Sequence, residues 1–176
     1  MSKPELLIAP CTHEAAKYAV EKWHYSKSLP ATKRVNFGVW EDGRFIGAII
    51  YSRGANKNLL NPYGLNVVEG CELCRVALNS HTSPVSQIVT VTIKQIKKLF
   101  PSMRLIVSYA DPSQNHSGTI YQAMNWVYTG SIKSTPKYWH QNRWLHNHQV
   151  DSLRLDKSKM MLQSQPDKHR YLYPLD

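Results

Sequence analysis

The sequence contains no long apolar run. Spanning a bilayer takes roughly twenty consecutive apolar residues, and no segment of these 176 residues approaches that length. The first residues, MSKPELLIAP, lack the apolar core of a secretory signal peptide. We therefore predict a cytoplasmic protein that does not associate with a membrane.

Cysteine is also scarce. The three cysteines, Cys11, Cys71 and Cys74, are an odd number and lie in apolar surroundings, as expected of reduced intracellular thiols rather than a disulfide framework. Cys71 and Cys74 have C-x-x-C spacing, but they lie in a predicted strand, where positions three apart point to opposite faces. The spacing therefore does not favour a zinc or redox site.

Acidic residues are few. Twelve Asp and Glu face 22 Lys and Arg, which gives a formal net charge of +10 and a pI near 9.6. Such an excess favours a polyanionic partner, because neutralising phosphates releases counterions. A surface that is basic only for solubility is the alternative. The hydrophobic content of 42%, with five Trp and ten Tyr, indicates a folded globule of one domain.

Strand and helix patterns alternate along the chain. Asp42-Gly43 between two β-rich runs predicts a hairpin, and the aperiodic stretch 53–70 predicts a long loop with a functional purpose. The predicted strands are 5–9, 34–40, 45–52, 72–78, 104–110, 126–128 and one near 150–155; the predicted helices are 12–23, 84–99 and one capped by Ser117. We predict an α/β fold with a mixed central sheet flanked by helices. Its catalytic domain is 1–156, and 157–176 is a basic extension that packs on the domain or trails from it.

Polar side chains gather after the strand 104–110. Ligands in open α/β sheets bind in the crevice outside the carboxyl ends of the strands, so this cluster predicts an enzyme. Its members are Ser108, Tyr109, Asp111, Asn115 and His116.

The order of elements resembles the GNAT fold of acyl-CoA-dependent N-acyltransferases. The segment GTIYQAMNWVYTG resembles the second acyl-CoA motif of that family, with Asn125-Trp126 where Gly-Phe is usual. More narrowly, KWHYS, ELCRVAL and SYADPSQNHSGTIYQAMNWVYTG resemble the Mom family of phage DNA modification proteins, over roughly residues 20–135. That resemblance implies carbamoylmethylation of the N6 amine of adenine in the host cytoplasm, which protects phage DNA from restriction.

One loop departs from the acetyltransferase pattern. The fold usually places Q/R-x-x-G-x-G/A after the fourth strand, where backbone N–H groups bind pyrophosphate at a helix N-terminus. This chain has NSHTSPVS there, and Pro84 has no N–H. Acetyl-CoA, implied by the resemblance, remains a predicted cofactor. The residues assigned to cofactor binding are Arg75, Ser83, Ser86, Asn115 and His116.

The resemblance also assigns the catalytic set. Its members are His24, Tyr25, Asp111 and Tyr121, and iron bound by Tyr25, Asp111 and Tyr121 is a second implied cofactor. Ser108 joins the catalytic set because of its polar position near the crevice, although it could also be a plain cap or turn residue. Without the resemblance, each has an ordinary structural explanation. His24 would cap a helix, Asp111 would accept N–H groups of a turn, and Tyr121 would pack in the core.

Cations alternate with aromatic rings in KSTPKYWHQNRWLHNH, as binding to unstacked nucleic acid requires. We predict a partner in double-stranded DNA with a flipped adenine, stacked on Tyr25, Tyr63 or Trp139; a homodimer is also possible. The residues assigned to DNA are Lys33, Arg34, Arg53, Lys137, Trp139 and Arg143. Two alternatives stay open: an acetyl-CoA-dependent acetyltransferase acting on a small or protein amine, and a non-catalytic DNA-binding protein.

Overall fold

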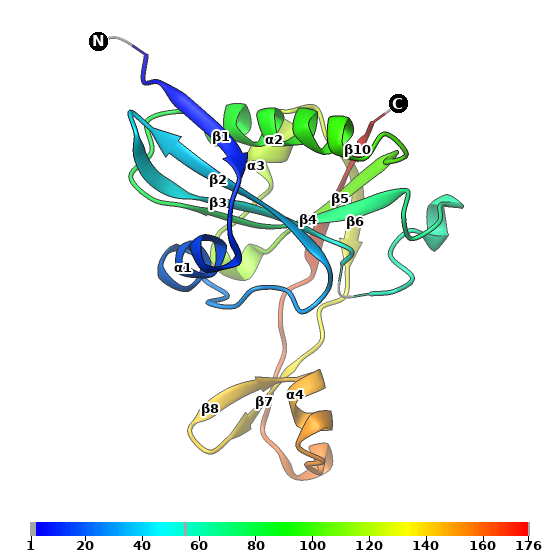
Figure 1. Ribbon diagram of the computed structural model, residues 1–176. Helices are drawn as coiled ribbons and strands as arrows, with labels where there is room; N and C mark the ends of the chain where they lie inside the picture. Colours follow the sequence, from blue (N-terminus) through cyan, green and yellow to red (C-terminus); the bar gives the residue numbers. More distant parts are fainter. Residues whose placement is uncertain (1–2, 55, 176) are drawn as a thin grey trace.

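A computed structural model describes residues 3–54 and 56–175 of the chain. The core is a seven-stranded sheet with strand order β1-β2-β3-β4-β5-β10-β6 (Figure 1). Its strands are β1 (Leu6–Pro10), β2 (Arg34–Glu41), β3 (Arg44–Ser52), β4 (Gly70–Leu78), β5 (Leu105–Ala110), β6 (Val127–Ile132) and β10 (Lys168–Pro174). Among these neighbours only β4 and β5 run parallel. The predicted hairpin is confirmed, since β2 and β3 pair up to Glu41 and Arg44 around Asp42-Gly43.

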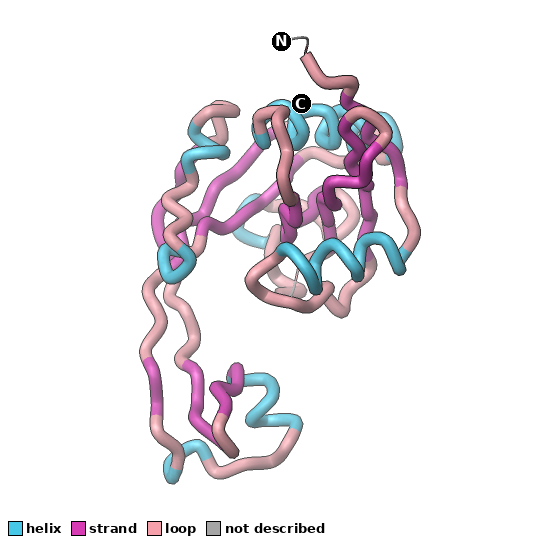
Figure 2. The backbone as a smooth tube through the Cα atoms, turned by 90° about the vertical axis from the view of Figure 1, so that its left-hand side faces the viewer, coloured by secondary structure: helices cyan, strands magenta, loops and turns pink. Residues whose placement is uncertain are grey.

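Helices cover both faces of the sheet (Figure 2). Helix α1 (His13–Trp23) begins where Thr12 Oγ1 accepts from the amide of Ala15, 3.2 Å away, and its buried Ala16, Ala19 and Val20 pack on β3 and β4. Helix α2 (Val85–Leu99) packs the apolar stripe predicted from the sequence on the opposite face. The predicted mixed α/β fold is therefore confirmed. No helix in the described ranges is long and apolar enough to cross a membrane.

Strands β4 and β5 pair over only part of their length. The parallel register runs from Gly70 opposite Leu105 to Leu73 opposite Ser108, and β4 then continues to Leu78 without β5. The two strands diverge beyond that point. Short elements follow β5: the 3-10 turn η2 (Pro112–Gln114) and helix α3 (Thr119–Gln122). The predicted cap of this helix, Ser117, is wrong by one residue, because Gly118 is the N-cap.

The end of the chain lies inside the sheet. Strand β10 is inserted between β5 and β6 and pairs antiparallel with both, and its Tyr171 is buried. It belongs to the segment 157–176 that we predicted to pack on the domain or trail from it. The last strand is therefore a structural part of the core.

A small lobe projects from the core between β6 and β10, on two extended connections (Figures 1 and 2). It contains β7 (Lys137–His140), β8 (Arg143–His146), helix α4 (Asn147–Ser152), the 3-10 turn η3 (Lys157–Lys159) and β9 (Leu162–Gln163). Tyr138, Leu145 and Val150 form its own apolar cluster. The strand predicted near 150–155 is wrong, because His146 and Gln149 form a capping box that starts α4 there.

Gly118 is expected to be sensitive to substitution. It has φ +86°, and a Cβ there would lie 2.3 Å from Tyr171 Oη, whereas Gly130, at φ +90°, has nothing within 4 Å. We expect Gly130→Ala to lower the free energy of unfolding by about 1 kcal/mol, from backbone strain alone. Gly118→Ala adds a steric clash and should lower it by about 3 kcal/mol. Urea unfolding of both variants measures this, and equal losses would contradict the close approach of Tyr171 to Gly118.

Candidate functional site

A pocket of about 290 Å³ opens where β4 and β5 diverge. Five segments line it: the end of α1, the middle of β4, the first residue of α2, the end of β5 with the loop that follows, and α3. The polar and aromatic side chains among the lining residues are His24, Tyr25, Arg75, Tyr109, Asn115, His116 and Tyr121. The structure therefore brings together residues that are almost a hundred positions apart in the sequence.

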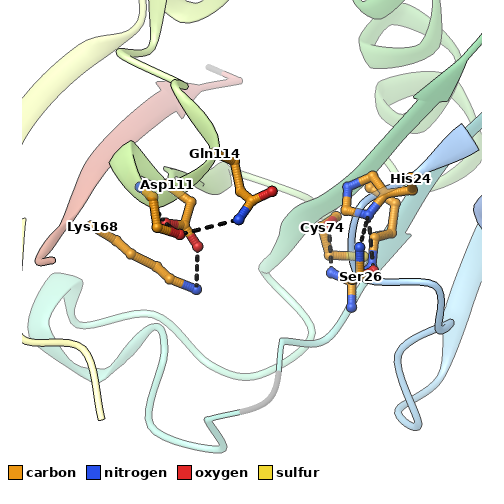
Figure 3. Close-up of polar contacts among 8 residues, drawn as sticks. His24, Ser26, Cys74, Asp111, Gln114 and Lys168 are labelled. Atoms are coloured by element: carbon orange, nitrogen blue, oxygen red, sulfur yellow. Dashed lines mark hydrogen bonds and ion pairs between the residues drawn. The ribbon is translucent and has the colours of Figure 1, made fainter. Parts of the chain in front are cut away.

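His24 is a neutral hydrogen-bond donor in this pocket. It caps the end of α1 and is 7% exposed. The backbone amide of Ser26, which can only donate, points at Nδ1 from 3.1 Å, and Ser26 Oγ lies 2.8 Å from the same atom (Figure 3). The proton of the neutral ring is therefore on Nε2. Burial, together with the charges of Arg75 and His116, lowers the pKa of His24 to about 4.

Tyr25 offers an aromatic face beside this imidazole. Its ring centroid lies 4.3 Å from that of His24 at an interplanar angle of 30°, and 5.7 Å from that of His116. The side chain is 45% exposed. Burial of its hydroxyl and the nearby Asp111 carboxylate raise the pKa of Tyr25, so the phenol stays protonated at neutral pH.

Tyr121 and Ser108 form a buried hydrogen-bonded chain at the floor of the pocket. Ser108 Oγ donates to the carbonyl of Leu73 at 2.7 Å, so Tyr121 Oη, also 2.7 Å away, donates to Ser108 Oγ. The Tyr121 ring stacks on Tyr171 at 5.0 Å. Burial raises the pKa of Tyr121 to about 12. Both hydroxyls thus fix α3 against β4 and β5.

Asp111 lies outside the residues that line the pocket. Its carboxylate accepts from the amide of Ser113 at 3.0 Å and from Ser113 Oγ at 2.6 Å, and pairs with Lys168 Nζ at 3.3 Å. Burial opposes ionisation, but these partners hold the pKa of Asp111 below its ordinary value. Figure 3 shows Asp111 and Lys168 well apart from His24. The predicted convergence is therefore partial: His24, Tyr25 and Tyr121 share the pocket, and Asp111 anchors the loop beside it.

The predicted iron ligands do not fit a metal site. Tyr25 and Tyr121 line the pocket but Asp111 does not, Tyr121 donates its proton to Ser108, and three donors already hold Asp111. Within residues 3–54 and 56–175, no group of three or more His, Cys, Asp and Glu side chains could hold a metal ion. The arrangement therefore does not support iron as a cofactor.

The residues predicted to bind a cofactor fall in two places. Arg75, Asn115 and His116 line the pocket, where Arg75 donates to the carbonyls of Ser28 and Cys74 at 3.1 and 2.7 Å. Ser83 and Ser86 lie instead at the start of α2 and do not line it. The pocket reaches the start of α2 through Val85, which lies between these two serines in the sequence.

The residues predicted to bind DNA also lie in two different places. Lys33, Arg34 and Arg53 flank a second cavity of about 350 Å³ at the start of β2 and the end of β3. The others, Lys137, Trp139 and Arg143, lie on β7 and β8 of the lobe. Trp139 is 38% exposed, and its ring centroid lies 5.1 Å from that of Trp144.

Three residues of this region escaped sequence reasoning. Ser26 sets the tautomer of His24, Lys168 neutralises Asp111, and Glu41 binds the loop before α2. Ser26 lies within the KWHYS motif and could have been found there. Lys168 contacts Asp111, which is 57 positions away in the sequence, and Glu41 contacts Thr82, which is 41 positions away. No local sequence pattern indicates either contact.

Comparison with known proteins places these features in a family. Residues 5–176 match the Mom protein family. The methylcarbamoylase mom of Escherichia phage Mu is 24% identical over 154 residues, which cover 85% of this chain and 64% of the relative, so the chain spans under two thirds of that protein.

Two solved acetyltransferases share the fold. The ribosomal-protein-S5-alanine acetyltransferase from Vibrio fischeri is 13% identical with a TM-score of 0.57, covering 100% of this chain and 96% of its own. A GNAT family acetyltransferase from Elizabethkingia anophelis with acetyl-CoA bound is 12% identical with a TM-score of 0.54, covering 97% and 98%. The predicted GNAT-like fold is confirmed.

The titration of His24 tests the geometry of the pocket. Its folded pKa of about 4 lies below the ordinary 6.5, so the unfolded chain binds the proton first as the pH falls. Stability from this group is complete above pH 6.5 and is lost between about 6.5 and 4. Long-range ¹H–¹⁵N NMR should show an unprotonated Nδ1 at pH 7 and a midpoint near 4. His24→Gln should remove this part of the acid-side loss, and a titration near 6.5 would contradict the prediction.

Proposed function

We propose that this chain, which belongs to the Mom protein family, is a transferase that modifies the N6 amine of adenine in DNA. The proposed product is carbamoylmethylated adenine, which would protect phage DNA from host restriction. The observation that carries the proposal is the pocket itself. It joins the KWHYS and SYADPSQNHSGTIYQ motifs, through His24, Tyr25, His116 and Tyr121, in a chain that matches the family over residues 5–176.

The pocket suits an extruded base. Chemistry on the exocyclic amine requires adenine to leave the duplex stack, at a cost of a few kcal/mol. A cavity of about 290 Å³ can hold a purine. The paired rings of Tyr25 and His24 at its edge give a surface on which a flipped base can stack.

The protonation states in the pocket suggest distinct roles. The adenine amine is a weak nucleophile because its lone pair is delocalised into the ring, so it must lose a proton as the new N–C bond forms. The bond between the transferred carbon and the leaving group of the donor breaks in the same exchange, and the leaving group departs with that electron pair. His24 presents Nε2–H and would donate to an acceptor atom of the base or of the transferred group. His116, an exposed imidazole that lines the same pocket, would accept the amine proton. Tyr121 and Ser108 would hold the floor in place.

An acetyl-CoA-dependent acetyltransferase is the alternative, favoured by the fold shared with an acetyltransferase that has acetyl-CoA bound. When bound, acetyl-CoA supplies an acyl group activated as a thioester. The alternative predicts acetylation of a small or protein amine without DNA. The loop before α2 has no glycine, and this argues against the acetyltransferase alternative.

A third function, that of a non-catalytic DNA-binding protein, would leave the polar lining of the pocket without a role.

The lobe is the proposed contact with double-stranded DNA. Residues 133–166 contain six Lys and Arg against two Asp, and Lys157 and Lys159 pair with Asp151 and Asp156. Lys137 lies on the same face of the β7–β8 hairpin as the exposed ring of Trp139, and Arg143, paired with His140, lies on the other face. Cations next to a flat ring suit phosphates and unstacked bases.

Nucleosides from DNA of cells that express the protein test the reaction. Mass spectrometry should find carbamoylmethylated deoxyadenosine with the wild-type chain. His116→Gln should lower its yield about 100-fold, because it removes a proton acceptor. His81→Gln, at an exposed histidine outside the pocket lining, is the matched control and should leave the yield unchanged. Finding only unmodified deoxyadenosine beside folded wild-type protein would overturn the proposal.

The salt dependence of duplex binding tests the lobe. Lys137→Ala and Arg143→Ala should each weaken binding and reduce the slope of log K against log salt by about 1, one phosphate contact each. Lys94→Ala removes an exposed cation from α2, on the far side of the core from the lobe (Figure 1), and should change neither quantity. Fluorescence anisotropy at several salt concentrations measures both. Equal effects from all three variants would show that only net charge matters.

A further inference from the structure

A buried carboxylate holds the loop at the start of α2. Glu41, the last residue of β2, is 4% exposed. Its Oε1 accepts from the amide of Ser83 at 2.6 Å, and its Oε2 accepts from the amide of Thr82 at 2.8 Å. Both oxygens of one side chain thus bind two successive backbone N–H groups.

These amides lie in the loop that leads into helix α2, just before the amides of its first turn, which belong to Val85, Ser86 and Gln87. Backbone N–H groups at the start of a helix lack partners within the helix and carry the positive end of its dipole. They therefore bind phosphate groups in many folds. Here α2 has 15 residues and is preceded by Thr82, Ser83 and Pro84. Two of these three residues give their N–H to Glu41, and proline has none to give.

The carboxylate is also charged. Burial opposes its ionisation, but the hydrogen bonds from Ser83 and Thr82 and the nearby His81 hold the pKa of Glu41 below its ordinary value. An incoming diphosphate would have to displace an ionised group from two charge-assisted hydrogen bonds. It would also meet the repulsion of a like charge.

We propose that Glu41 is a built-in substitute for the diphosphate of a ligand, so that no nucleoside diphosphate is bound at the start of α2. Glu41 already occupies the amide of Ser83, so Ser83 cannot offer that N–H group to the diphosphate of acetyl-CoA. The group donor is instead recognised through the part that enters the 290 Å³ pocket, which Arg75 and Asn115 line. This inference rests on the proposed function only in assuming that a donor exists.

A comparison of two probes tests the inference. Coenzyme A and pantetheine share the thiol arm, but only coenzyme A carries the diphosphate. Isothermal titration at about 0.5 M salt suppresses non-specific attraction to this basic chain. The wild-type protein should bind coenzyme A no more than about threefold tighter than pantetheine. Glu41→Ala frees two amides, and should bind coenzyme A at least about tenfold tighter than pantetheine.

Amide NMR shows where the probe binds. Coenzyme A should shift the resonances of Thr82 and Ser83 in Glu41→Ala and leave them in place in the wild type. If Glu41→Ala fails to fold, Glu41→Gln, which keeps the size and removes the charge, takes its place.

Two results would overturn the inference. In the first, the wild-type protein binds coenzyme A more than about tenfold tighter than pantetheine, and the amide resonances of Thr82 and Ser83 both shift. In the second, the Glu41→Ala variant folds but gains no affinity for coenzyme A. Neither result depends on DNA modification, so failure here is distinct from failure of the proposed function.

Discussion

The site depends on the short parallel contact between β4 and β5. Four residue pairs, from Gly70–Leu105 to Leu73–Ser108, hold the strands together. After them β4 continues under α1 toward α2, while β5 ends at Ala110 and turns into the loop 111–118. Backbone groups beyond the last pair no longer bind one another, and side chains from five segments line that space. The pocket is the direct result of where this pairing stops.

Several polar groups around the pocket already have a partner. Tyr121 and Ser108 form one chain of hydrogen bonds, Arg75 binds two carbonyls, and Ser26 fixes His24. Satisfied groups of this kind hold a substrate in place at little cost, because they need not reorganise. They are poor ligands for a metal ion, because the atoms that could bind the ion already take part in hydrogen bonds to other protein groups. These paired groups therefore hold the shape of the pocket.

Local patterns predicted much of this fold. The hairpin at Asp42-Gly43, the apolar stripe of α2 and the strand–loop–helix segment around Asp111 were all readable, because turn residues and periodicity act over a few positions. The lobe, the insertion of β10 and the contact between Glu41 and Ser83 were not, since each depends on segments distant in sequence. Helix α4 shows the same limit on a small scale: β-rich residues near Val150 form a helix because a capping box and a local apolar cluster outweigh propensity.

Asp111 has the position of a catalytic residue but the contacts of a structural one. Its place after β5 indicates catalysis, yet its carboxylate binds Ser113 and Lys168. Lys168 is the first residue of β10, where the chain returns from the lobe. The ion pair therefore joins the loop that carries His116 to the base of the lobe (Figures 1 and 3). The lobe and the edge of the pocket are therefore linked by one salt bridge as well as by the chain itself.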